Sequence, residues 1–248
     1  PDPPPARPLW CRDSVFMQVG GGSYPMRVYH GCPSPENMRR CRQAAPSFCH
    51  GACWTPEKMT AHDWPYFVDN GVYSGSFDHD KWVDMLDLLR EKMAHAPDFV
   101  VLPDVFNDAA ETIAKHRRFV DDVIDRELRP APVIQPGMPV AAQVAIADGL
   151  NAETIFVGGE CRWQRAHGAE IVAEAHDRDL RVHIGNPGSV EGLVWAYQTG
   201  FDSVDTSSIL QNQYFHWLEA LEDAKHGLST GAGIKAGRQT ELGTTTTD

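Results

Sequence analysis

Short apolar runs that alternate with amphipathic stretches constrain the fold of this 248-residue chain more than any other feature. The runs have strand character and lie at residues 26–30, 66–69, 99–102, 132–135, 155–158, 180–184 and 202–205. Between them, a helical spacing of apolar residues marks 80–93, 109–128, 166–177, 189–198 and 214–224. Strand then helix, repeated about seven times, predicts parallel units that build a closed barrel or a doubly wound sheet.

The residues at the ends of these runs favour the barrel. Most are polar residues or glycines: Asp69, Asp104, Gln135, Gly158, His183 and Asp205. In a barrel the carboxyl ends of all strands open into one mouth, where such groups converge. We therefore expect an α/β chain with a (β/α)8 TIM-like barrel, which could be incomplete or irregular, over residues 14–226. Residues 1–13 and 227–248 are predicted to be flexible tails.

Charge and hydropathy exclude some classes of protein. The net charge of −12, from 34 acidic and 22 basic residues, argues against nonspecific coating of nucleic acid. No apolar run approaches the roughly 20 residues of a membrane helix, and residues 1–8 lack a signal-peptide core. We expect a cytoplasmic protein without a membrane partner. The pattern leaves the oligomeric state open.

A group of cysteines raises the question of a metal site. Cys32, Cys41, Cys49 and Cys53, with two nearby histidines, could in principle bind zinc. Their spacing lacks the tight Cys-x2-Cys pairs of structural zinc sites, so buried or free thiols are favoured. We expect neither a metal nor another cofactor.

Three carboxylates at strand ends, Asp69, Asp104 and Asp205, are the main candidates for chemistry. Each could instead cap a helix or form a turn, but their convergence favours a catalytic site. Paired carboxylates suit displacement at a sugar anomeric carbon, because one attacks while the other moves a proton. Gln135 could read the polar edge of a ligand beside the open backbone of Gly158 and Gly159. His183 could line the pocket or belong to the core.

Five segments, in order, resemble those of the tRNA-guanine transglycosylase superfamily. The first four segments are Asp69-Asn70-Gly71-Val72-Tyr73, Val101-Leu102-Pro103-Asp104, Val133-Ile134-Gln135-Pro136-Gly137 and Phe156-Val157-Gly158-Gly159. The fifth starts with Gly200-Phe201-Asp202-Ser203-Val204-Asp205. The resemblance covers about residues 25 to 220 and is closest to the DpdA-type enzymes, which place deazapurines in DNA. Two residues depart from the family pattern: Asn70 replaces a serine and Val72 a glycine.

The resemblance implies a role for each residue. Asp205 is the nucleophile, although alignment on Phe-Asp-Ser would select Asp202, which strand alternation turns the other way. Asp69 is the general acid and base, and Asp104 binds the Watson–Crick edge of the base. The remaining substrate-binding residues are Asn70, Gly71, Gln135, Gly158, Gly159 and His183. Tyr73 or Trp163 could stack on the base, or simply belong to the core.

The resemblance also implies the substrates, namely guanine, a 7-deazaguanine base such as 7-cyano-7-deazaguanine (preQ0), and DNA. DNA is favoured over tRNA because the sequence has no match to the zinc module of tRNA-acting members. Candidate contacts to the nucleic acid are Arg39, Arg40, Arg162 and Arg165. A tRNA enzyme, a nucleosidase or glycosidase, and a non-catalytic barrel subunit remain the alternatives.

Overall fold

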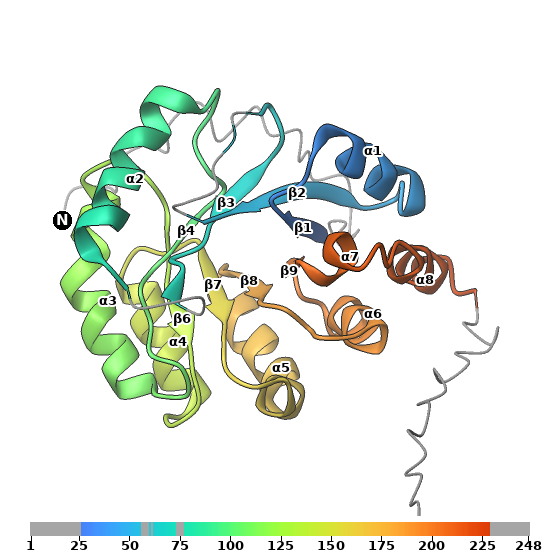
Figure 1. Cartoon of the computed structure of the whole chain (residues 1–248). Helices are drawn as coiled ribbons and strands as arrows, with labels where there is room; N and C mark the ends of the chain where they lie inside the picture. The colour runs from blue at the N-terminus through green and yellow to red at the C-terminus, as the bar shows by residue number, and fades with distance from the viewer. Residues whose placement is uncertain (1–25, 56–59, 61, 73–76, 229–248) are drawn as a thin grey trace, which may run out of the picture.

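The computed structural model describes residues 26–55, 60, 62–72 and 77–228, which form a parallel β/α barrel (Figure 1). Its nine strands run in the order β5-β4-β3-β2-β1-β9-β8-β7-β6. Their bounds are β1 Arg27–Gly31, β2 Cys49–Trp54, β3 Tyr66–Val68, β4 Val100–Val101, β5 Pro130–Ala131, β6 Val133–Ile134, β7 Thr154–Val157, β8 Arg181–Ile184 and β9 Ser203–Thr206. The predicted TIM-like barrel is confirmed.

A single proline accounts for the ninth strand. Pro132 separates β5 from β6 and has no N–H to donate, so one barrel strand is divided into two short ones. β5 pairs with β4, whereas β6 pairs with β7. The chain itself therefore joins the two ends of the strand order, and the nine strands occupy eight barrel positions.

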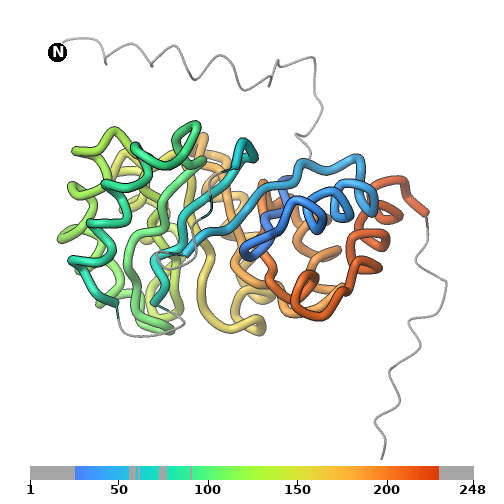
Figure 2. The backbone as a smooth tube through the Cα atoms, turned by 45° about the horizontal axis from the view of Figure 1, so that its top comes forward, coloured from blue at the N-terminus to red at the C-terminus, as the bar shows by residue number. Residues whose placement is uncertain are grey.

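Helices cover the outside of the barrel, and the first and last helices lie side by side where the two ends of the barrel meet (Figure 2). The helices are α1 Pro35–Ala44, α2 His79–Lys92, α3 Ala109–Ile124, α4 Val140–Gly149, α5 Cys161–His176, α6 Val190–Thr199, α7 Ser208–Gln211 and α8 His216–Lys225. Between β2 and β3 the described residues form no helix, so the second unit is irregular. Among the described residues, none of the helices combines the length and apolar content needed to cross a bilayer.

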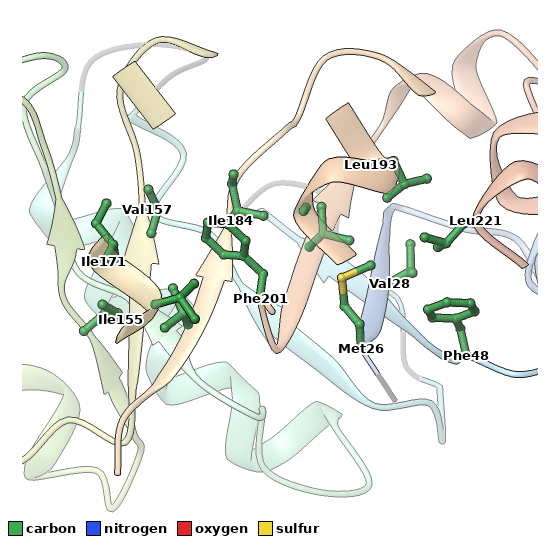
Figure 3. Packing of buried hydrophobic residues seen from close by; sticks show 14 of the residues in the cluster. Met26, Val28, Phe48, Ile155, Val157, Ile171, Ile184, Leu193, Phe201 and Leu221 are labelled. Carbon is green, nitrogen blue, oxygen red and sulfur yellow. The ribbon is translucent and has the colours of Figure 1, made fainter. Parts of the chain in front are cut away.

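The pleat of the strands separates two kinds of core. Val28, Val204 and Ile184 face outward and pack against the helices, as Figure 3 shows for Val28 and Ile184. Tyr29, one residue after Val28, belongs instead to the cluster inside the barrel. That inner cluster also contains Cys53, Phe67, Phe99, Val101, Ala131 and Val133. This alternation by two decides which polar residues at the strand ends face the mouth.

The sequence pattern missed β2, α1, α4 and the short α7, and its run at residues 132–135 did not include β5. β2 has the sequence Cys-His-Gly-Ala-Cys-Trp, which contains no β-branched residue. α1 begins at a Ser34 cap followed by Pro35, a start signal that the prediction did not use. The proposed N-terminal tail lies outside the described residues, as does the C-terminal one beyond residue 228.

Candidate active site

Side chains that the strands turn inward meet at the carboxyl end of the barrel. Asp69 follows β3, Asp104 follows β4 and Gln135 follows β6, while His183 and Asp205 lie within β8 and β9. Hydrogen bonds join Asp104 to Gln135 and Asp205 to His183. The charge of Asp69 is close enough to interact with those of Asp205 and Asp104. The structure thus brings these five predicted site residues together at the carboxyl end of the barrel, with His183 buried beneath Asp205.

Asp104 accepts a hydrogen bond at each carboxylate oxygen. Asn70 Nδ2 donates to Oδ1 at 2.9 Å and Gln135 Nε2 donates to Oδ2 at 2.7 Å. Burial raises the pKa of Asp104, and these two donors oppose the rise. Because each carboxylate oxygen has a second lone pair, Asp104 can still accept two parallel hydrogen bonds from a ligand.

Gly158 and Gly159 shape the wall beside Gln135. A Cβ atom on Gly158 would lie 2.6 Å from Gln135 Nε2, so a larger residue would displace the amide from Asp104. Gly159 has φ +78° and leaves room for Pro136. The oxygen of the Gln135 amide is held as well, because Oε1 accepts from the backbone N–H of Asn107 at 3.1 Å. The glycine pair therefore helps to position Gln135.

Asp69 has the electrostatics of a proton-transfer group. Burial raises its pKa to about 6, and the nearby charge of Asp205 adds to the rise. A backbone hydrogen bond from Gly71 to Asp69 Oδ1, at 3.2 Å, acts in the opposite direction. A carboxyl group with a pKa near 6 can both give and take a proton at neutral pH.

Asp205 is held by β8 and the segment that follows it. His183 Nε2 lies 3.0 Å from Asp205 Oδ1, and the backbone N–H of Asn186 reaches the same oxygen at 3.4 Å. The side chain of Asp205 is 20% exposed, whereas that of His183 is 0% exposed. His183 therefore lies beneath Asp205, where it contacts the carboxylate instead of the open mouth.

Asp202, the rival nucleophile, lies away from the mouth. Its Oδ2 accepts from the backbone N–H of Val182 at 2.7 Å and is 2.9 Å from His176 Nε2. His176 is the last residue of α5, so Asp202 joins the amino-terminal ends of two strands to a helix end. This placement agrees with the strand alternation that selected Asp205.

Cys53 lies beside the candidate site, although the sequence suggested it only as a zinc ligand. It lies on β2 inside the barrel, where burial and the nearby charges of Asp69 and Asp205 raise the pKa of its thiol. The alternation of inward and outward residues along β2 would have placed Cys53 inside the barrel, but the sequence pattern did not predict this strand. Among the described residues no three histidine, cysteine or acidic side chains form a group that could hold a metal ion. The four candidate zinc cysteines therefore do not form such a group.

Only some of the four arginines predicted to contact nucleic acid lie near the mouth. Arg39 pairs with Glu36, and Arg40 stacks on Phe215 with its guanidinium carbon 3.8 Å from the ring centroid. Both belong to α1, on the outside of the barrel. Arg162 is exposed in the first turn of α5, and Arg165 packs on Trp195. α5 begins directly after the glycine pair, so Arg162 is nearer to the candidate site.

The structure describes only one of the two aromatic residues considered for stacking on the base. Trp163 contacts the glycine wall, since a Cβ on Gly159 would lie 3.2 Å from its ring. Its ring centroid is also 5.2 Å from that of His167, beside a hollow between α4 and α5. Tyr73 lies outside the described residues.

Comparisons with known proteins agree with this architecture. Neither a protein-family model nor a curated protein sequence matches the chain. A chain of the Amycolatopsis orientalis BexX/CysO complex matches with a TM-score of 0.54 and 13% identity, over 85% of this chain and 93% of that one. A Coccidioides immitis protein assigned as a fructose-1,6-biphosphate aldolase matches with a TM-score of 0.56 and 11% identity, over 84% and 91%. These likenesses show the fold alone.

Proposed function

We propose that this chain is a base-exchanging transglycosylase that replaces guanine in DNA with a 7-deazaguanine base. The observation that carries the proposal is the meeting of Asp69, Asp104 and Asp205 at one barrel mouth, from three different strand ends. A nucleophile, a proton-transfer group and a base-reading group are the three functions that the reaction needs. The ordered resemblance to guanine transglycosylases supports the choice of reaction.

Asp104 suits the recognition of guanine. Asn70 and Gln135 each donate to one of its oxygens, which fixes the plane of the carboxylate. The open lone pairs of both oxygens match the adjacent N1–H and N2–H donors of guanine, which is a bidentate arrangement. Adenine lacks this pair of donors, so the same geometry would select guanine and 7-deazaguanine bases.

The exchange proceeds in two balanced steps. Asp205 attacks C1′ of the deoxyribose, the bond from C1′ to guanine breaks, and the bonding electrons leave with the base as Asp69 gives it a proton. Asp69, now a carboxylate, takes a proton from the incoming base, whose nitrogen attacks C1′ and releases Asp205. Both aspartates return to their starting states. The pKa of Asp69, raised to about 6 by burial and the charge of Asp205, suits both directions of transfer.

A target base within duplex DNA must leave the stack to reach a barrel mouth. Arg162 is positioned to meet a phosphate of the flanking strand, because it is exposed in the first turn of α5 beside the glycine wall. Arg39 and Arg40 lie on α1 with partners of their own and are weaker candidates for this contact.

Product analysis tests the proposal. A guanine-containing DNA oligonucleotide is incubated with the protein and 7-cyano-7-deazaguanine, then digested to nucleosides for mass spectrometry. We expect the deazaguanine nucleoside with the wild-type chain and with Asp202→Asn, and none with Asp205→Asn. Asp202 is a matched control because its asparagine can still accept from Val182.

Two other results would replace the proposal. Release of guanine without incorporation would indicate a nucleosidase, in which water takes the place of the incoming base. Incorporation into tRNA and not into DNA would keep the chemistry and change the polymer. The absence of release and of incorporation with both polymers would contradict base exchange.

A further inference from the structure

His183 has both ring nitrogens engaged by side chains of the neighbouring strand. Nδ1 lies 2.9 Å from Ser203 Oγ, and Nε2 lies 3.0 Å from Asp205 Oδ1. All three residues point into the barrel, with the imidazole between the hydroxyl below and the carboxylate above. The histidine is completely buried.

Aromatic rings surround the imidazole on several sides. The centroids of Tyr29, Phe67, Phe99 and Phe156 lie 5.7, 4.9, 5.2 and 4.8 Å from that of His183. This burial lowers the pKa of His183, although Asp205 opposes the effect. The ring is therefore neutral at pH 7, with one nitrogen donating and the other accepting.

The partners determine which nitrogen carries the proton. An ionised Asp205 can only accept, so Nε2 carries the hydrogen and donates to Oδ1. Nδ1 must then accept, and its partner, the hydroxyl of Ser203, can donate. The hydrogen bonds thus run in one direction, from Ser203 through His183 to Asp205.

The two oxygens of Asp205 differ in their surroundings. Oδ1 accepts from His183 and from the backbone of Asn186. No residue in the described part of the chain donates to Oδ2. One oxygen is therefore held while the other is left for chemistry, which a purely structural ion pair would not require.

We propose that His183 is a positioning residue that holds Oδ1 of Asp205 so that Oδ2 attacks C1′, and that Ser203 orients His183 by donating to Nδ1. This inference rests on the proposed base exchange. As the bond from Oδ2 to C1′ forms, Oδ1 becomes the carbonyl oxygen of the ester and keeps its hydrogen bond. When the incoming base breaks that bond, its electrons return to the carboxylate, and Nε2–H stabilises the charge that develops. The histidine transfers no proton.

Two substitutions separate positioning from packing. His183→Phe fits the aromatic surroundings and removes the donor, whereas His183→Gln keeps an N–H donor at a similar distance. In single turnover, we expect adduct formation to slow about 100-fold in the phenylalanine variant. The glutamine variant should recover at least about 10-fold of that loss, and the dissociation constant of free guanine should change in neither. Equal losses in both variants, or a phenylalanine variant within about threefold of wild type, would overturn the proposal.

A spectroscopic measurement tests the same arrangement without activity. The ¹⁵N spectrum of labelled histidine rings, assigned by comparison with His183→Gln, should show His183 protonated at Nε2 alone. Ser203→Ala removes the donor to Nδ1, so it should slow adduct formation by leaving the ring less firmly oriented, while Asp205 keeps the proton on Nε2. A wild-type ring protonated at Nδ1 would contradict the positioning role. If the wild-type chain exchanged no base on DNA or tRNA, the proposed function would fail, while the spectrum would still decide how His183 holds Asp205.

Discussion

Gly158 and Gln135 are in contact across two neighbouring strand ends, and this contact leaves no room for a Cβ atom. The Gln135 nitrogen that such an atom would meet at 2.6 Å is the one that donates to Asp104 at 2.7 Å. The glycine therefore determines the position of the carboxylate that we propose reads the base, although it contributes no side chain itself.

A methyl group at this glycine should disturb recognition of the base. We expect Gly158→Ala to move the Gln135 amide, weaken its bond to Asp104 and raise the dissociation constant of guanine about 10-fold, equivalent to ~1.4 kcal/mol. Isothermal titration calorimetry measures the change. Gly149→Ala is the matched control, because a Cβ there meets nothing within 4 Å and should leave binding unchanged. Equal binding by both variants would contradict the role of the contact.

Asp104 should be needed for binding of the free base as well as for turnover. Asp104→Asn exchanges one acceptor oxygen for a donor that faces Asn70 or Gln135 and the base. A hydrogen bond to a charged group contributes roughly 1.5–3 kcal/mol, so guanine binding should weaken about 10- to 100-fold. Asp108→Asn is the control, since it caps α3 and asparagine caps equally well. Unchanged calorimetric affinity in Asp104→Asn would remove Asp104 from the base site.

The raised pKa of Asp69 makes stability depend on pH. Its folded value of about 6 exceeds the ordinary 3.8, so the native state holds a proton that the unfolded state releases. The stability of the wild type therefore falls as pH rises from about 4 to 6. Asp69→Asn lacks this effect, so its advantage in free energy of unfolding should grow to about 3 kcal/mol at pH 8. Urea denaturation at pH 4 and pH 8 tests the difference, and one that did not change with pH would contradict the assignment.

His116 should have the opposite pH dependence. Burial lowers its pKa to about 3, and its Nε2 accepts from the backbone N–H of Val133, next to the proline that divides the barrel strand. In the unfolded chain His116 is protonated below about pH 6.5, whereas in the native state its ring stays unprotonated. The free energy of unfolding therefore falls as pH drops below that value. The loss from this group should reach about 2 kcal/mol at pH 5. His116→Gln, which keeps an acceptor, should abolish this part of the pH dependence measured by urea denaturation. A variant that kept the full slope would show that another group causes it.

The sequence supports the barrel because apolar runs and helical spacing alternate, and it supports the site because strand ends carry Asp69, Asp104 and Asp205. Alternation by two also selected Asp205 over Asp202, and the structure places Asp202 against Val182 and His176. These inferences use local sequence patterns that remain visible in the folded structure. The assignments of substrate and catalytic role remain predictions.

Tertiary contacts explain what the pattern missed. β2 contains Gly51, which a strand pattern penalises, yet a Cβ there would lie 2.7 Å from the ring of Tyr29 on the neighbouring strand. Only the packed barrel shows why glycine is required. Because β2 was missed, the inward position of its residue Cys53 was missed too. The bond of Asn70 to Asp104 joins residues 34 apart in the chain, so no local pattern could reveal it.

Trapping of the covalent intermediate tests the central claim most directly. The protein is mixed with guanine-containing DNA without an incoming base, denatured and examined by mass spectrometry of its peptides. We predict a deoxyribosyl ester on Asp205, with guanine released in equal amount, in the wild type and in Asp202→Asn but not in Asp205→Asn. An adduct on another residue, or base exchange that persists in Asp205→Asn, would contradict the account.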